Sequence, residues 1–247
     1  TAREDHWFAP GPDYTQHSPD VVWGGARDAL WNNGDLINYA PDQCMLQDTT
    51  LNMTTYGFGH QIINENWMSD DFTIPEEDNW NIETITFFAY QTGSTLTSTI
   101  NDYRVMIYDG PPFEPTSSVV FGSAATNVLQ ATGWSGIYRT LESAPGATNR
   151  PIMANICDVM VTLGPGTYYV VWQCGGTLSS GPWAPPVAIW GEDTTGDSWQ
   201  SVDNGLTWAY AVDGITGTGQ GMPFVVEGMH STSVESVTWT SVKALYR

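Results

Sequence analysis

The chain has 247 residues, of which 27 are Asp or Glu and only 7 are Lys or Arg, so its formal net charge is −20 at pH 7. A polyanion of this strength repels nucleic acids and anionic membrane surfaces, and we exclude both as partners. The length and a hydrophobic content of 41% allow one large all-β domain or two small ones. The 12 Trp, 11 Tyr, 25 Gly and 15 Pro are typical of extracellular β-proteins. We therefore expect a protein that is secreted or displayed at the cell surface, without membrane insertion.

Residues 1–27 contain several prolines and aromatic residues but follow neither the period of a strand nor that of a helix. They are predicted to form an extended arm that lies on a surface. The next segment, residues 29–38, has an Asn33-Gly34 turn between short apolar pieces and predicts a first strand or a tight hairpin. Residues 49–63 are rich in glycine and aromatic residues and predict another strand.

Stronger strand patterns begin near residue 70. The segment Trp80–Tyr90 is apolar on both faces, which predicts a strand in the middle of a sheet. Residues Tyr103–Asp109 alternate between apolar and polar side chains, and prolines stop the pattern directly afterwards. Further strands are predicted over residues 71–75, 119–121, 136–141, 198–202, 207–212 and 223–227.

The most strongly patterned stretch is Pro151–Gly176, which predicts two strands folded back around Gly164–Thr167. With Pro165 and Gly166 at the centre of the turn, Val161 faces Val170, Val159 faces Trp172 and Cys157 faces Cys174. This register makes one face of the pair wholly apolar, as a core requires. Pro-Gly fits a type II turn, whereas two-residue hairpins prefer the mirror-image types, so a bulge or a longer loop is the alternative.

The hairpin register places Cys157 opposite Cys174, within disulfide range. A disulfide between them agrees with an oxidising extracellular space. Cys44 is then left over. It is either a buried free thiol or a link to another chain.

Residues 179–191 form a proline-rich loop that carries Trp183 and Trp190. Two tryptophans on a stiff loop are candidates for a glycan-stacking platform, although tryptophan in a sandwich is more often part of the core or of an interface. Since no helical period of useful length occurs, about ten short strands predict a jelly-roll-like antiparallel β-sandwich over residues 28–228.

Residues 229–247 form a strand-like tail beyond the sandwich. The tail would pair either on the edge of its own domain or on the edge of another subunit. In the second case, the residues buried in the assembly would be Val237, Trp239 and Leu245.

The stretch Ser201–Trp208 matches the pattern S-x-D-x-G-x-T-W of the Asp-box. The motif predicts a turn in which Asp203 accepts backbone hydrogen bonds, Gly205 takes a positive φ and Trp208 packs across the base. The motif recurs from blade to blade in sialidase-like propellers but occurs once here. We therefore predict a structural clamp and not a sialidase.

Acidic residues at loops and strand ends suggest a calcium site. Asp70, Asp71 and Asp109 are the candidate ligands, because calcium takes six to eight oxygens from carboxylates and carbonyls. A second acidic group comprises Glu192, Asp193 and Asp197. The alternative is that these carboxylates are simply solvated, since no calcium-binding repeat is present.

No catalytic motif stands out. The four histidines are scattered without metal-ligand spacing, and Gly133–Gly136 does not fit the G-x-S-x-G pattern of a serine nucleophile. With 27 acids, a pair of carboxylates spaced for glycoside hydrolysis arises by chance. We therefore predict that the protein is not an enzyme.

Several strand and turn sequences together resemble a group of secreted bacterial β-sandwich modules of uncertain function. They are DDFTI and IETITFFAYQTGS in residues 70–94, YRVMIYDGPP, GPWAPP and SVDNGLTW. The resemblance covers residues 28–228 and implies a jelly-roll-like sandwich without naming an activity. Such modules are often surface-anchored, but we expect no permanent anchoring here because no C-terminal sorting segment is evident.

The sequence thus favours a secreted structural or adhesive protein that associates with itself, as a filament or surface-layer subunit, through its terminal segments. The alternative is a carbohydrate-binding module that uses Trp183 and Trp190, and a glycoside hydrolase is the third hypothesis. The expected partners are further copies of the chain and glycans, and calcium is the one candidate cofactor.

Overall fold

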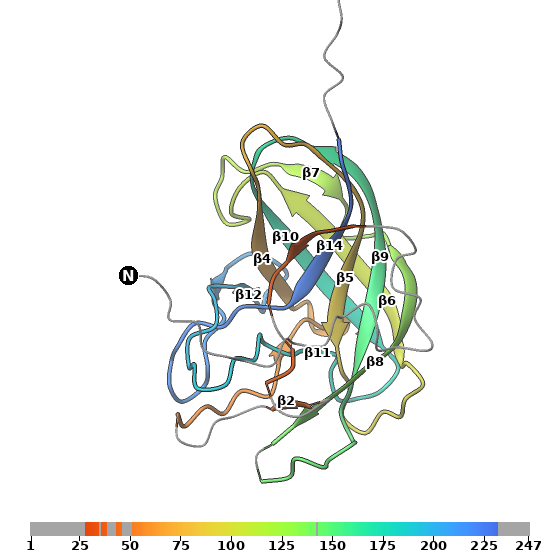
Figure 1. The fold of residues 1–247 in the computed structure, drawn as a ribbon, viewed down its shortest axis with the longest axis vertical. Helices are drawn as coiled ribbons and strands as arrows, with labels where there is room; N and C mark the ends of the chain where they lie inside the picture. The colour runs from red at the N-terminus through yellow and green to blue at the C-terminus, as the bar shows by residue number, and fades with distance from the viewer. Residues whose placement is uncertain (1–27, 35, 39–42, 46–50, 142, 232–247) are drawn as a thin grey trace, which may run out of the picture.

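Two antiparallel β-sheets pack face to face as a sandwich in the computed structural model, which describes residues 28–34, 36–38, 43–45, 51–141 and 143–231. Figure 1 views the two layers one behind the other. The predicted all-β sandwich is confirmed. The expected N-terminal arm and residues 232–247 of the tail lie outside the described residues. In the part of the chain that is described, no helix has the length and apolarity needed to span a membrane.

The first sheet has the strand order β1-β14-β5-β9-β8-β2. Five of its strands are antiparallel to their neighbours, and β2 lies parallel to β8 at one edge. The strands are β1 (Asp28–Asn32), β2 (Gln43–Met45), β5 (Trp80–Ala89), β8 (Leu129–Thr140), β9 (Pro151–Leu163) and β14 (Phe224–His230).

The second sheet has the order β13-β12-β4-β10-β6-β7. Its strands are β4 (Trp67–Ile74), β6 (Ile100–Tyr108), β7 (Val119–Gly122), β10 (Gly166–Gly176), β12 (Trp199–Ser201) and β13 (Ala209–Tyr210). A separate two-stranded sheet joins β3 (Phe58–Gly59) to β11 (Trp183–Ala184), and a 3-10 helix, η2, spans Ile62–Asn64.

The main core fills the space between the sheets because alternate side chains of each strand point inward. On β6, Tyr103, Val105 and Ile107 are fully buried, as the alternation predicts. At the centre, the ring of Phe87 lies 4.9 Å from that of Trp172 on the opposite sheet. The inward faces are therefore read correctly from the sequence, whereas some strand partners are not.

The predicted hairpin over Pro151–Gly176 is wrong. Strand β9 pairs with β5 and β8 in one sheet, whereas β10 pairs with β4 and β6 in the other. The expected pairs Val161–Val170, Val159–Trp172 and Cys157–Cys174 do not form, and the chain instead arches from one layer to the other. Two strands joined as a hairpin within one sheet bury the same alternate side chains as two strands joined across the two sheets. The alternation of apolar residues in the sequence is therefore the same in both cases and could not show which one forms.

The predicted disulfide is also absent. Cys157 and Cys174 are buried free thiols that belong to the core from opposite sheets. Facing sheets pack about 10 Å apart, whereas a disulfide needs Cα atoms about 4.4–6.8 Å apart. Cys44 is a buried free thiol as well, and its Sγ accepts a hydrogen bond from Nη1 of Arg139 at 2.9 Å.

Candidate ligand-binding face

An aromatic stack lies on the outer face of the second sheet. Trp199 of β12 pairs across the strands with Tyr210 of β13, and their ring centroids are 3.9 Å apart. The ring centroid of Phe113, from the loop between β6 and β7, lies 4.2 Å from that of Trp199. Trp199 is therefore in close contact with two other aromatic rings.

The two rings that contact Trp199 remain open to solvent. Tyr210 is 56% exposed and Phe113 is 38% exposed. Strand pairing fixes Tyr210 and Trp199, and the stacking contact fixes Phe113 against them. The stack is therefore a rigid, exposed aromatic surface, which is the kind of element that binds ligands at small cost in conformational entropy.

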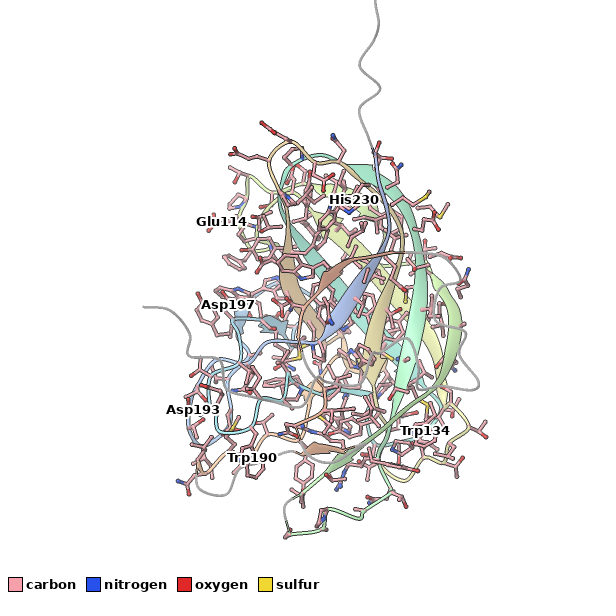
Figure 2. All side chains as sticks on the ribbon, in the orientation of Figure 1. Glu114, Trp134, Trp190, Asp193, Asp197 and His230 are labelled. Carbon is pink, nitrogen blue, oxygen red and sulfur yellow. The ribbon has the colours of Figure 1, made fainter. Side chains whose placement is uncertain are left out.

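Three carboxylates lie beside the stack. One oxygen from each of Asp70, Asp71 and Asp197 lies within 4.8 Å of the others. Ser69 of β4 pairs with Trp199, and Asp71 lies two residues further along the same strand face. Figure 2 shows Asp197 on the same side of the molecule as Glu114, the neighbour of Phe113. The acidic group and the aromatic stack thus form one continuous face.

The structure brings together two of the three predicted calcium ligands. Asp70 and Asp71 meet Asp197 and not Asp109, whose Oδ1 accepts a hydrogen bond from the Ser118 backbone N–H at 2.6 Å. Asp109 ends its strand away from this group because it follows β6, not β4.

Both carboxylate oxygens of Asp70 accept hydrogen bonds from within the fold. Its Oδ2 accepts hydrogen bonds from Asn33 Nδ2 at 2.9 Å, Ser198 Oγ at 2.5 Å and the Met222 backbone N–H at 2.8 Å. Its Oδ1 accepts one from the Asp71 backbone N–H at 2.9 Å. These bonds join β4 to segments that lead into β12 and β14 and out of β1. Burial nevertheless raises the pKa of Asp70 to about 6.

Asp71 and Asp197 repel each other electrostatically. The pKa of Asp71 is raised by burial and then by the negative charge of Asp197. Tyr169 lies opposite Asp71 on β10, and its pKa is raised by burial and then by Asp71, Asp197 and Tyr210. Tyr169 therefore lies beside two like-charged carboxylates on the same face.

This carboxylate group is a poor match for calcium. The oxygens of Asp70 already accept four hydrogen bonds, so direct coordination would fall to Asp71 and Asp197. Two carboxylates supply at most about four oxygens, fewer than the six to eight that calcium takes. The residues therefore fit calcium incompletely, and we derive no role for it.

The two tryptophans predicted to form a platform lie differently. Trp183 is partly buried against a second core cluster, and its Nε1 donates to Ser180 Oγ at 3.3 Å. Trp190 is 38% exposed and lines a small surface depression together with Arg139, Glu192 and other residues. Figure 2 shows Trp190 near Asp193, below Asp197 in the view. Because Trp183 packs inward, the loop does not present both indoles to one ligand.

The Asp-box segment forms a turn that is closed by side-chain hydrogen bonds. Oδ1 of Asp203 accepts a hydrogen bond from the Thr207 backbone N–H at 2.9 Å, and Oδ2 accepts one from Thr207 Oγ1 at 2.6 Å. Ser201 Oγ donates to Asp203 at 2.8 Å and accepts from the Gly205 N–H at 2.8 Å. Gly205 has φ +81°, and Trp208 is partly buried. This turn joins β12 to β13 and so positions Trp199 and Tyr210.

The two histidines in the described residues, His60 and His230, each contact a neighbouring side chain of the fold. His60 is fully buried, its Nδ1 accepts a hydrogen bond from Trp172 Nε1 at 3.1 Å, and burial lowers its pKa to about 3. His230 ends β14, and its Nδ1 lies 2.8 Å from Asp78 Oδ2. Neither residue belongs to the aromatic and acidic face.

Phe113, Trp199 and Tyr210 were not predicted from the sequence as site residues. A usable signal was present, because Trp199 and Tyr210 are equally distant from the Asn204-Gly205 turn of the Asp-box. Tyr169 and Phe113 had no such signal, since they reach the face through long-range pairing and a loop. The assembly residues Val237, Trp239 and Leu245 lie outside the described residues, so their role stays a prediction.

Comparisons of the chain with protein-family models, curated proteins and solved structures each find no match, so the resemblance to secreted bacterial modules is supported only as far as a two-sheet β-sandwich.

Proposed function

We propose that this sandwich is an extracellular carbohydrate-binding module, and that the stack of Phe113, Trp199 and Tyr210 is its sugar-contacting surface. The observation that carries the proposal is a cluster of three aromatic rings on an outward sheet face, in which Trp199 contacts the exposed rings of Phe113 and Tyr210. The C–H face of a pyranose packs on such a ring, and a rigid ring loses little entropy when it binds.

The neighbouring carboxylates favour a sugar over a purely apolar ligand. A sugar presents an apolar face and an edge of hydroxyl donors. Asp71 and Asp197 offer acceptor oxygens at the border of the stack. Ligand sites typically combine an apolar contact surface with a few placed polar groups, and this face has both.

Binding of oligosaccharides by calorimetry, after a glycan-array screen, tests the proposal. Tyr210→Ala removes an exposed ring from the stack and should weaken binding about tenfold, the equivalent of roughly 1.4 kcal/mol. Trp190→Ala is the matched control, since Trp190 is also partly exposed but lies on the other loop. Loss of binding in the control alone, or no glycan bound by the wild-type protein, would refute the proposal.

The same binding experiment checks the expectation that the protein is not an enzyme. A bound oligosaccharide should be recovered at its original length after prolonged incubation. Release of shorter sugars would point instead to Asp71 and Asp197 as an acid and nucleophile pair, because carboxyl groups about 5 Å apart are used by retaining glycosidases.

Self-association as a secreted structural or adhesive protein is our second candidate. An apolar patch supports it: Ile63 is 88% exposed, Leu206 82% and Val202 65%. Backbone contact between Asn204 N–H and Glu65 O at 2.9 Å brings η2 and the Asp-box turn together at this patch. Exposed apolar clusters of this kind favour protein contacts.

Truncation tests the part played by the tail. The cut belongs after Ser231, because β14 runs to His230 and the Ser231 N–H still bonds to Asn79 O at 2.6 Å. If residues 232–247 drive assembly, light scattering should show smaller particles for the truncated chain. Unchanged particle size would exclude the tail and leave Leu206→Ser as the test of the apolar patch.

A further inference from the structure

We propose that the ligand of the aromatic and acidic face is a cationic glycan, one whose sugars carry free protonated amino groups. This inference rests on the proposed glycan-binding function and adds the charge of the substrate to it. It predicts that amino sugars bind more tightly than their N-acetylated or uncharged counterparts, and that acidic sugars are rejected.

The first support is the unfavourable electrostatic state of the face itself. Asp71 and Asp197 have oxygens within 4.8 Å of each other, and the charge of Asp197 raises the pKa of Asp71. An ammonium group between them would offset this repulsion and donate up to three hydrogen bonds. A neutral hydroxyl can make the hydrogen bonds but leaves the repulsion in place.

The described part of the chain shows no internal counter-ion at this face. Arg104 bonds to Asp102 at 3.4 Å and to Ala124 O at 3.1 Å. Arg139 is buried against Cys44 and the Tyr56 carbonyl, and Arg150 lies over the Tyr56 ring at 4.5 Å. Each arginine that the structure describes is thus engaged elsewhere, so none of them neutralises Asp71 and Asp197.

Two tyrosine side chains lie near the acidic group. The electrostatic interactions of Tyr169 reach Asp71, Asp197 and Tyr210. Tyr210 belongs to the stack, and Tyr169 is the cross-strand partner of Asp71. Ring faces attract ammonium groups by about 0.5–1 kcal/mol at exposed sites, in addition to any ion pair.

Ser69 provides an independent sign of a missing ligand group. It is fully buried on the outer face of β4, opposite Trp199 and two residues before Asp71. Its hydroxyl has no hydrogen-bond partner within the described residues. Buried hydroxyls are normally paired, so a polar group of the ligand that enters beside Trp199 would complete this one.

The test compares two oligosaccharides of equal length and linkage, a glucosamine oligomer and its fully N-acetylated form, by calorimetry with the wild-type protein. Binding is measured at a pH where the amines are protonated and Asp71 and Asp197 are ionised. We expect the amine form to bind at least tenfold more tightly, and this preference should shrink as salt concentration rises.

Matched variants separate the site from the overall charge. Asp71→Asn with Asp197→Asn should abolish the preference. Because it removes a repulsion, it should not lower the thermal stability. Glu76→Gln with Glu77→Gln removes the same charge from an exposed loop and should keep the preference. An oligolysine of equal charge should compete weakly, since it lacks a sugar face for Tyr210.

The outcomes are distinguishable. Equal binding of both oligosaccharides, lost in Tyr210→Ala, would overturn the cationic inference and keep the proposed function. Amine binding that survives Tyr210→Ala, or that oligolysine displaces as well as the sugar does, would overturn the inference as a general attraction to a polyanion. Failure to bind either oligosaccharide or any other glycan would overturn both proposals.

Discussion

Two glycine-containing turns of the chain can be compared, the β9–β10 connection and the β12–β13 connection. They differ in whether the strands that they join pair with each other. At Gly164–Gly166 the chain passes from β9 in one sheet to β10 in the other, whereas the Asp-box turn joins β12 and β13 as true neighbours in one sheet. In the first turn, Tyr168 Oη donates to Gly164 O at 3.2 Å, and each strand pairs with other strands of its own sheet. In the second, Asp203 and Ser201 close the turn with side-chain hydrogen bonds.

This difference separates what holds the protein together from what faces a ligand. The β9–β10 arch places Trp172 and two cysteines in the core. The β12–β13 hairpin displays Trp199 and Tyr210 on the outside. Two tryptophans at comparable positions near a turn therefore have opposite roles, and substitution should tell them apart.

Trp172→Ala should have the largest effect on stability. Trp172 is 1% exposed, contacts Phe87 and donates from Nε1 to His60. Truncation of a buried tryptophan costs about 3–5 kcal/mol of the free energy of unfolding, measured by urea titration. Trp199→Ala removes two aromatic pairs and should cost about 1–3 kcal/mol, while it weakens glycan binding. Equal losses for both variants would contradict the division of roles.

The sequence predicted those features that depend on local pattern. Alternation identified the buried face of β6 and the two-sided burial of β5, and the Asp-box pattern identified the clamp at Asp203. The pairing of β10 with β4 and β6 depends on which strand edges are free, which no local pattern specifies. The one register inferred from a turn, around Pro165 and Gly166, was wrong because β9 and β10 pair in different sheets.

The candidate site shows the same limit. Asp70 and Asp71 were singled out as acids at a loop or strand end, but both lie within β4, where Asp70 points inward and Asp71 outward. Asp197 joins them only because β12 pairs with β4, and Phe113 arrives from the loop after β6. Long-range pairing therefore creates the face, and the sequence supplied its residues without their arrangement.

The next largest effect is expected in the pH dependence of the free energy of unfolding. It comes from Asp70, whose hydrogen bonds connect β4 to the segments that lead into β12 and β14. Burial raises the pKa of Asp70 from 3.8 to about 6, so the folded chain retains a proton that the unfolded chain has lost. The stabilisation is therefore fully present below about pH 4 and is lost as pH rises to about 6. The difference in pKa corresponds to about 3 kcal/mol.

Asp70→Asn should remove this dependence, because its amide oxygen still accepts the bonds from Asn33, Ser198 and Met222 but cannot titrate. His60 acts in the opposite direction in the same range. Its pKa of about 3 means that only the unfolded chain gains a proton as pH falls below about 6.5. The informative quantity is the difference in unfolding free energy between variant and wild type at each pH. A difference that stays constant from pH 4 to pH 7 would exclude Asp70 as the titrating group.

The smallest of these effects is expected for Gly205→Ala in the turn that positions the aromatic stack. Gly205 has φ +81°, where an L-residue is strained by about 1–2 kcal/mol. Gly146→Ala is the matched control, because nothing lies within 4 Å of an added Cβ and no positive φ is required there. Urea unfolding should show the loss for Gly205→Ala alone. If the hairpin also holds the stack in place, glycan affinity should fall more than in Gly146→Ala, whereas unchanged affinity would mean that pairing with β4 is sufficient to position Trp199.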